Sequence, residues 1–181
     1  GVFIVNPSIE YINGGPVHVD YEGHIDVKPA LPADPTLLFN WHSSHYGGQK
    51  IQLNSNERWR KTVGPILIYC NEGDNTHDMW QDALSRAAKE KKSWPYEWVS
   101  IPGYEHAAAR GTASGRLQVN DPQSPVSGAG GAWVGLAHKP YPVMLRNMNT
   151  TFDWQLDGKY YQYWTQADSS GNFTIPHARP G

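Results

Sequence analysis

The sequence contains almost no cysteine, no long apolar run and no excess of charge of either sign. Cys70 is the single cysteine among 181 residues, so no disulfide can form within the chain, and the redox compartment stays open. No apolar run approaches the ~20 residues needed to cross a bilayer, so no transmembrane helix is predicted. A net charge of -2, with 18% charged residues, gives no electrostatic argument for binding nucleic acid or an anionic membrane.

The two ends of the sequence suggest that it is an excerpt of a longer chain. It opens directly in a strand-like run, Val2–Val5, with no initiator methionine and no basic leader. It closes on Pro180-Gly181, a pair that marks a turn and therefore normally introduces another strand. We expect further sequence on both sides, and groups that complete an active site can lie there.

Aromatic and turn-forming residues are abundant. Eight Trp, ten Tyr, 18 Gly and 14 Pro are typical of a turn-rich β protein rather than a helical bundle. Aromatic faces also stack well on sugar rings, although rings that simply fill a β core are the more common case. The composition therefore permits a polysaccharide-binding protein without demanding one.

Apolar runs and turn signals predict a mainly β chain interrupted by one helix. The helix is predicted over residues 76–92, capped by Asn75 with Asp78 three residues on. Its apolar positions recur at helical spacing, so one face should pack. The run Ile66–Cys70 predicts a buried strand, and a domain boundary is placed near residue 108. Strands are expected over residues 2–5, 17–21, 36–41, 51–53, 59–63 and 65–70, then over 114–119, 132–137, 159–165 and 171–175.

The loop His42–Gly48 is the segment best suited to chemistry. It places two imidazoles, two hydroxyls and a phenol beside two glycines that allow close backbone approach. A metal site is weakly indicated, because residues three apart on a strand face opposite ways and no third ligand follows from spacing. Ser43 and Ser44 lack the strand-turn-helix setting of a hydrolase nucleophile. A proton-transfer histidine and a purely structural loop remain as the two readings.

Several long motifs resemble the rhamnogalacturonan lyases of polysaccharide lyase family 4. The resemblance covers nearly the whole chain, in matching order, and motifs of this length are far more specific than a short pattern. The matching segments are Asn6–Pro16 (NPSIEYINGGP), Trp41–Gly48 (WHSSHYGG), Glu57–Tyr69 (ERWRKTVGPILIY), Met79–Ala83, Trp94–Tyr96, Arg110–Leu117, Trp133–Ala137, Tyr161–Asp168 and Gly171–Gly181.

The resemblance implies a fold in two parts. Residues 1–108, including the helix over 76–92, are expected to form the C-terminal part of a large catalytic β-sandwich of the galactose-mutarotase-like supersandwich type. Residues 109–181 are expected to form a small fibronectin III-like or carboxypeptidase-regulatory-like β-sandwich, truncated at its C-terminal end. Members of the family are secreted enzymes, so a secreted protein is implied. Separately, a monomer is expected.

The resemblance also implies a reaction and a catalytic residue. Family members cleave the bond from rhamnose to galacturonic acid in rhamnogalacturonan I, the pectin backbone, by β-elimination. A lysine and a histidine are proposed to transfer the protons. The histidine matches His45, whereas the lysine lies upstream of residue 1, so the excerpt alone is expected to be inactive. No cofactor is implied, and an assisting Ca²⁺ stays open because Asp20, Glu22 and Asp26 are close together without a recognised calcium-loop spacing.

Other residues are weaker candidates for substrate binding. Gly14 and Gly15 match a turn beside the family's cleft, and they serve either the substrate or a plain turn. His18 follows on a predicted strand, where a structural role is the more common one. The remaining candidates are His42 and Tyr46 of the histidine loop, and Arg58 and Arg60, whose guanidinium groups suit a uronate carboxylate but equally suit a solvated surface. A noncatalytic carbohydrate-binding β-sandwich and a structural β-sandwich linker are the alternative functions.

Overall fold

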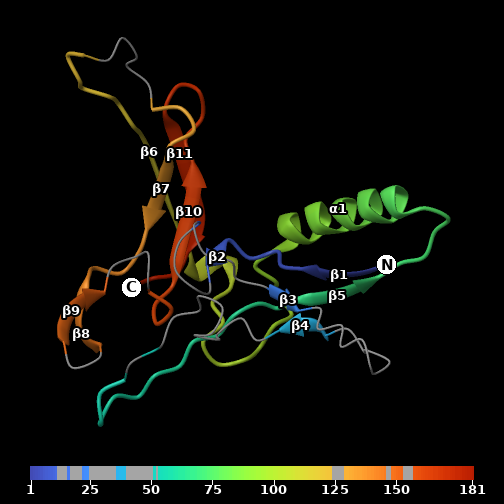
Figure 1. Cartoon of the computed structure of the whole chain (residues 1–181), viewed down its shortest axis with the longest axis horizontal. Helices are drawn as coiled ribbons and strands as arrows, with labels where there is room; N and C mark the ends of the chain where they lie inside the picture. Colours follow the sequence, from blue (N-terminus) through green and yellow to red (C-terminus); the bar gives the residue numbers. More distant parts are fainter. Residues whose placement is uncertain are drawn as a thin grey trace, which may run out of the picture. The chain divides into compact units, whose positions relative to one another are not determined.

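The structure, a computed structural model, describes residues 1–11, 16, 22–24, 36–39, 51, 53–123, 129–145, 148–152 and 157–181. Within these ranges the chain is mainly β with one α-helix and one 3₁₀ turn, which confirms the predicted class (Figure 1). The elements are β1 (Val2–Val5), β2 (Glu10–Tyr11), β3 (Glu22–His24), β4 (Thr36–Phe39), β5 (Leu67–Cys70), α1 (Thr76–Ser93), η1 (Ala107–Ala109), β6 (Gly111–Arg116), β7 (Trp133–Leu136), β8 (Tyr141–Leu145), β9 (Met148–Phe152), β10 (Gln162–Gln166) and β11 (Asn172–Ala178).

The strands form small, open sheets, as expected for parts of β-sandwiches. Antiparallel pairs join β1 with β5, β11 with β6, β3 with β4, and β8 with β9. A three-stranded sheet has the order β2-β10-β7. The chain divides into two compact units, residues 1–10, 60–134 and 165–181 in the first, and residues 11–59 and 135–164 in the second. The boundary predicted near residue 108 stays a prediction.

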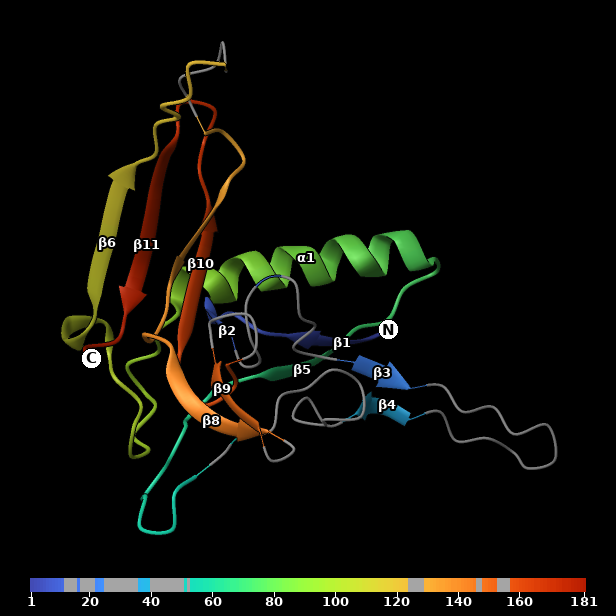
Figure 2. The same ribbon diagram turned by 60° about the vertical axis from the view of Figure 1, so that its left-hand side comes forward.

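The helix α1 begins and ends where its sequence predicts. The side chain of Asn75 accepts a hydrogen bond from the backbone N of Asp78 at 2.8 Å, which satisfies one of the free N–H groups of the first turn. The helix ends at Ser93, one residue beyond the prediction. Its packing is less complete than expected, because Trp80 stays 51% exposed while Ala83 is buried. The two-stranded β1–β5 ribbon lies beside the helix (Figure 2), and this packing leaves Trp80 half exposed.

Loss of the helix cap has a measurable consequence. We expect Asn75→Ala to lower the free energy of unfolding by about 1 kcal/mol, because the N–H of Asp78 loses its acceptor and the carboxamide is too exposed for any larger effect. Urea unfolding followed by circular dichroism measures the change. The exposed Asn120, which lies outside any helix, supplies the control, and equal losses in Asn75→Ala and Asn120→Ala would contradict the capping role.

The β1–β5 pair corrects the predicted burial of Cys70. The strand itself is present, with Val2 opposite Cys70 and Ile4 opposite Ile68. Alternate residues of a strand point to opposite faces, and only one face of this ribbon lies toward α1. Ile68 is consequently 69% exposed and Cys70 is exposed as well, so the prediction of a fully buried strand is wrong.

The apolar core of the first unit lies mainly in the irregular segment after α1. Trp94, Tyr96, Val99 and Tyr104 are buried against one another, and Ile9 packs on them. The backbone N of Tyr96 donates to the Tyr104 hydroxyl at 2.6 Å, so the segment has a polar anchor inside the core. A connection without regular secondary structure is therefore among the best-packed parts of the described chain.

The antiparallel pair of β6 and β11 contains a β-bulge near the end of the chain. Its register runs from Asn172 opposite Arg116 to Ile175 opposite Ala113, and it shifts before Ala178. His177, which lies in this irregularity, has a φ of 54°, a conformation uncommon outside glycine. The bulge turns the backbone so that the carbonyl of His177 is available to a buried side chain described below.

Both faces of β10 are covered at its first residues. Gln162 and Tyr163 point to opposite faces of the strand, and both are buried. Trp164 lies where Gly135 has no side chain, since a Cβ at residue 135 would stand 2.3 Å from the indole. This close approach explains the glycine in the middle of β7. Neither face is open to a polysaccharide at this end of β10.

Candidate functional site

The structure describes two of the eight predicted site residues. Arg58 and Arg60 are both exposed, on an irregular segment that precedes β5. Their guanidinium groups face water, so each remains open to an anionic ligand or to solvation. The other six lie outside the described residues, and their roles stay predictions: Gly14, Gly15, His18, His42, His45 and Tyr46.

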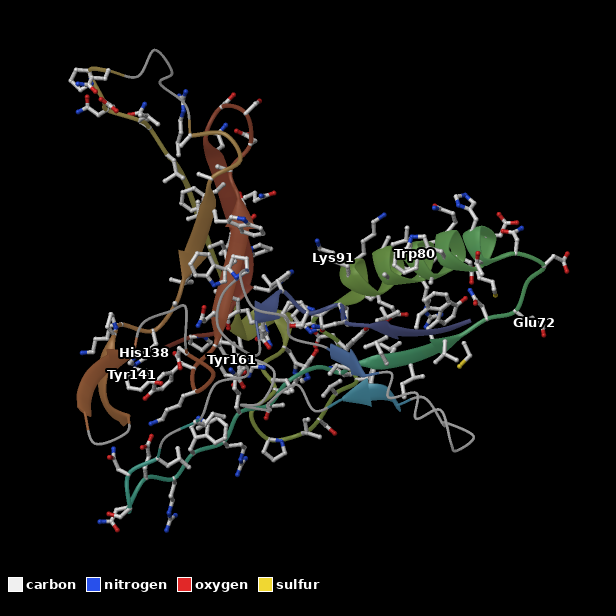
Figure 3. All side chains as sticks on the ribbon, viewed as in Figure 1. Glu72, Trp80, Lys91, His138, Tyr141 and Tyr161 are labelled. Atoms are coloured by element: carbon white, nitrogen blue, oxygen red, sulfur yellow. The ribbon has the colours of Figure 1, made fainter. Side chains whose placement is uncertain are left out.

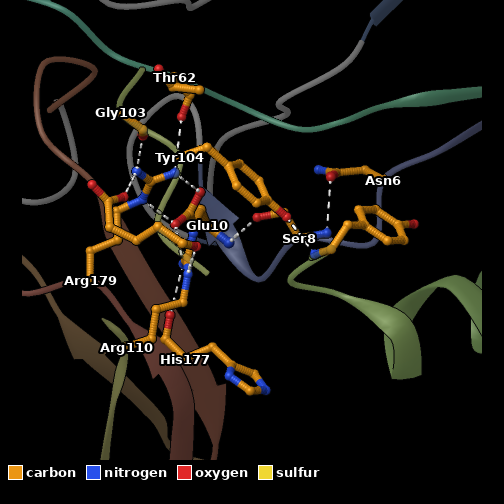
Figure 4. A network of polar contacts seen from close by, with 11 residues as sticks. Asn6, Ser8, Glu10, Thr62, Gly103, Tyr104, Arg110, His177 and Arg179 are labelled. Carbon is orange, nitrogen blue, oxygen red and sulfur yellow. Dashed lines mark hydrogen bonds and ion pairs between the residues drawn. The ribbon is translucent and has the colours of Figure 1, made fainter. Parts of the chain in front are cut away.

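Glu10 stands at the centre of a buried ionic cluster of Glu10, Glu105, Arg110 and Arg179, here called the Glu10 cluster (Figure 4). Its Oε1 accepts from Arg110 Nη1 at 2.7 Å and from Arg179 Nε at 2.5 Å. Its Oε2 accepts from Arg179 Nη2 at 3.1 Å, so Arg179 binds the carboxylate through two nitrogens. The Glu10 side chain is 2% exposed, and charge-assisted bonds of this kind are among the strongest in proteins.

Arg179 joins this carboxylate to the segment that precedes β6. Its Nη1 bonds the Glu105 carboxylate and the carbonyl of Gly103, and its Nη2 donates to the carbonyl of Thr62 at 3.3 Å. A single guanidinium thus contacts three parts of the chain that are far apart in sequence: Glu10, Thr62 and the segment 103–105. Lysine offers no planar fork and could not reproduce the set.

Arg110 completes the cluster from its other side. Its side chain is wholly buried, with Nε donating to the carbonyl of Glu105 at 2.7 Å and Nη1 to that of His177 at 2.9 Å. The guanidinium carbon lies 4.7 Å from the ring centre of Trp94, a cation–π geometry. Two positive and two negative groups balance the charge, and guanidinium groups occupy both carboxylates. The cluster is therefore suited to joining segments rather than to moving protons.

A second cluster, in the other unit, surrounds Lys159. Its Nζ lies 2.5 Å from Glu57 Oε1, and 5.6 Å and 5.5 Å from the ring centres of Tyr141 and Tyr160. The buried Asp157 accepts from the Tyr141 hydroxyl at 2.9 Å and from the backbone N of Lys159 at 2.8 Å. We call these five residues the Lys159 cluster, and Figure 3 labels Tyr141 within it.

The contacts of the Lys159 cluster are suited to structure rather than to proton transfer. Burial, followed by the hydrogen bond to Asp157, raises the pKa of Tyr141, so the phenol stays a donor near neutral pH. The lysine is paired with a carboxylate and is 6% exposed. A proton-transfer lysine needs a free amine, and this one has its charge compensated. Lys159 thus does not replace the upstream lysine that the family resemblance implies.

The Glu57–Lys159 pair gives the fold a pH dependence. The hydrogen bond from Lys159 lowers the pKa of Glu57 below its ordinary 4.5. A lowered folded-state pKa stabilises the protein above the unfolded value, and the contribution is lost as the pH falls through the lowered pKa. Glu57→Gln should therefore lower the Tm at pH 7, and its difference from the wild type should shrink below about pH 4.5. Thermal scans across pH measure this, and the exposed Glu72 supplies a control in Glu72→Gln (Figure 3). A pH-independent difference would contradict the ionic origin.

Sequence reasoning missed both clusters. Glu10, Arg110 and Lys159 were visible as charged residues, but their oppositely charged partners lie about a hundred or more positions away in the chain. The available signal was weak: a glutamate inside an apolar and turn-rich stretch, and arginines at the borders of predicted strands. Such long-range pairing follows from the folded topology and not from spacing.

Comparison with known proteins finds a family match for the C-terminal part of the chain. Residues 129–181 match the family described as "Polysaccharide lyase family 4, domain II". The short name of this family, fn3_3, is consistent with the fibronectin III-like sandwich that the resemblance implies for this region. No solved structure shows a significant match to the chain.

The whole chain is also similar to individual lyases. It is 26% identical to the "Rhamnogalacturonate lyase" of Dickeya dadantii (strain 3937), over 100% of this chain and 26% of that protein. It is 26% identical to the "Probable rhamnogalacturonate lyase C" of Aspergillus oryzae and 28% identical to that of Emericella nidulans, over 100% of this chain and 23% and 15% of those proteins. These matches confirm the resemblance to polysaccharide lyase family 4. The chain spans about a quarter or less of the length of these relatives.

Proposed function

We propose that this chain is a section of an eliminative rhamnogalacturonan lyase that cleaves the rhamnose to galacturonic acid bond of the pectin backbone. One observation carries the proposal: the full 181 residues align with proteins named rhamnogalacturonate lyase, from a bacterium and from fungi. The motif around His45 belongs to the aligned region. A secreted and monomeric protein is part of the same proposal.

The reaction explains which groups are needed. A base removes the C5 proton of the galacturonate, the electron pair forms the C4=C5 double bond, and the C4–O4 bond breaks. The O4 of the leaving sugar takes a proton, and the uronate carboxylate requires a compensating positive charge as carbanion character develops. His45 is proposed to transfer one of the protons. Its partner would be a lysine outside this section of the chain.

The exposed arginines fit the remaining requirement. A guanidinium group binds a carboxylate through two parallel hydrogen bonds, and neither Arg58 nor Arg60 lies in either of the two ionic clusters. We assign them to binding the uronate, with Gly14 and Gly15 allowing close backbone approach. His18, His42 and Tyr46 complete the proposed substrate contacts.

The assay is direct. Intact protein is mixed with rhamnogalacturonan I or with homogalacturonan, and the ultraviolet absorbance of the unsaturated uronate is followed. We expect absorbance to rise with rhamnogalacturonan I only. Binding of rhamnogalacturonan I with no rise would favour the noncatalytic carbohydrate-binding alternative, and the absence of both would favour a structural linker. The 181-residue section alone should give no product, and full activity in it would contradict the placement of the partner lysine.

A further inference from the structure

Trp98 is the most exposed large apolar side chain among the described residues, at 72%. Keeping an indole in water forfeits roughly 1.5–3 kcal/mol that its burial would contribute, so an exposed tryptophan on a well-packed frame is a candidate contact for a ligand. Scattered exposed aliphatic residues need no such explanation. The feature lies outside the motifs on which the family resemblance rests.

The frame beneath Trp98 is rigid. Glu97 and Trp98 form a turn between the buried residues Tyr96 and Val99, which belong to the core of the first unit. The Tyr96 ring lies 5.3 Å from the indole, at an interplanar angle of 37°. The indole is thus presented on a fixed backbone and supported on one side by a second ring, which limits the entropy lost when a ligand binds.

Polar groups beside the indole define the ligand chemistry. The Glu97 side chain is largely exposed, and its Oε2 lies 3.9 Å from Nδ1 of His106. The other ring nitrogen of His106 lies 2.7 Å from the carbonyl of Val99, which orients the imidazole. A free carboxylate accepts hydrogen bonds from sugar hydroxyls, whereas it repels a uronate carboxylate. The indole supplies an apolar face for the C–H groups of a sugar ring.

We propose that Trp98 and Glu97 form a binding site for a neutral sugar residue, with the indole stacked on the sugar ring and the Glu97 carboxylate accepting from its hydroxyls. The inference rests on the proposed function for its ligand class, because a pectic polysaccharide carries both neutral and acidic sugars. It deepens that function by adding a contact that distinguishes the two kinds of sugar. The neutral sugar is either the rhamnose of the backbone or a sugar of a side chain.

The test measures binding to ligands that cannot be cleaved. Intact protein is titrated calorimetrically with a neutral galacto-oligosaccharide, which has no uronate to undergo elimination, and with an oligogalacturonide. We expect Trp98→Ala to weaken binding of the neutral ligand roughly tenfold, and Trp98→Phe to retain most of it because a stacking ring remains. Trp80→Ala removes another half-exposed tryptophan, one that packs on Phe3, and should bind like the wild type.

Substitution of Glu97 separates a binding role from a structural one, because only a binding role predicts opposite changes in affinity for neutral and acidic ligands. Glu97→Gln should leave stacking intact. It should weaken binding of the neutral ligand slightly and strengthen binding of the oligogalacturonide, because charge repulsion is removed.

If the wild type binds only a rhamnogalacturonan backbone oligosaccharide and Trp98→Ala weakens that binding, the occupant is the backbone rhamnose. Wild-type affinity in Trp98→Ala for every neutral ligand, or equal losses in Trp98→Ala and Trp80→Ala, would overturn the proposal. The absorbance assay is separate, so a failed lyase proposal and a failed sugar site are distinguishable.

Discussion

Replacing His45 by alanine is expected to abolish most turnover of rhamnogalacturonan I while leaving polymer binding intact. General acid–base catalysis contributes about a hundred- to ten-thousand-fold, so kcat should fall by that order while KM changes little. The initial rate of product absorbance measures the loss, and calorimetry with intact polymer measures the retained affinity. A binding protein would show no turnover to lose.

The loop supplies its own matched control. His42 lies three residues before His45, is proposed to contact substrate, and adds the same imidazole to the loop. His42→Ala should raise KM more than it lowers kcat, because a binding contact is lost rather than a proton transfer. Equal effects of the two substitutions on kcat would contradict the assignment of proton transfer to His45. If the His45→Ala variant kept a turnover within about threefold of the wild type, the assignment of proton transfer to His45 would be wrong.

Replacing Glu10 by alanine should produce the largest loss of stability. The substitution removes the carboxylate that binds both guanidinium groups, and it leaves the wholly buried Arg110 without its ionic partner. Removing one partner of a buried pair costs about 3–5 kcal/mol, because an uncompensated charge stays in the interior. Urea unfolding, analysed for midpoint and slope, measures the change.

Two further variants separate charge burial from packing. Glu105→Gln alters the more exposed carboxylate of the same cluster, 32% exposed against 2% for Glu10, so its effect should be much smaller. A triple variant with Glu10→Leu, Arg110→Met and Arg179→Met removes all three charges together and should recover much of the stability lost in Glu10→Ala. A triple variant less stable than Glu10→Ala would show that the ionic bonds are strongly favourable in themselves.

Local signals predicted the local elements well. The helix follows from Asn75 at its cap and from a run without Gly or Pro whose second half, residues 83–92, is rich in good helix formers, and both act within a few residues. The strand at Leu67–Cys70 follows from its apolar run. The strand predicted over residues 59–63 does not form, and Gly64 beyond it has a φ of 91°, so the backbone departs there from the extended conformation. The backbone conformation of a single residue cannot be predicted from the hydrophobic pattern of its neighbours.

Burial was harder to predict because it depends on what covers an element. Ile68 and Cys70 look like core residues in sequence, yet the ribbon that holds them has one uncovered face among the described residues. The segment 94–104 shows the opposite case: it has no regular structure, and its aromatic residues form a core. The Glu10 cluster joins residues up to 169 positions apart, a pairing that no local pattern contains.

The functional prediction came from resemblance rather than from pattern. Periodicity and composition left the histidine loop with two readings, proton transfer or structure. The long motifs selected the first, which stays a prediction, whereas the relatives named rhamnogalacturonate lyase support only the likeness to lyases. The surface tryptophan shows what the structure adds, because exposure of 72% is not visible in a sequence rich in tryptophan.

Cleavage in oxygen-labelled water tests the central claim most directly. β-Elimination breaks the C4–O4 bond and forms a C4=C5 double bond without consuming water, so cleavage should add no label beyond the slow exchange of the anomeric oxygen at the new reducing end, which an uncleaved reducing oligosaccharide measures. The mass of the new non-reducing end should be lower by one water than that of a hydrolysis product, and the product should absorb in the ultraviolet. A saturated new non-reducing end, with label at the new reducing end above that exchange, in a protein whose cleavage depends on His45, would show hydrolysis and contradict the account.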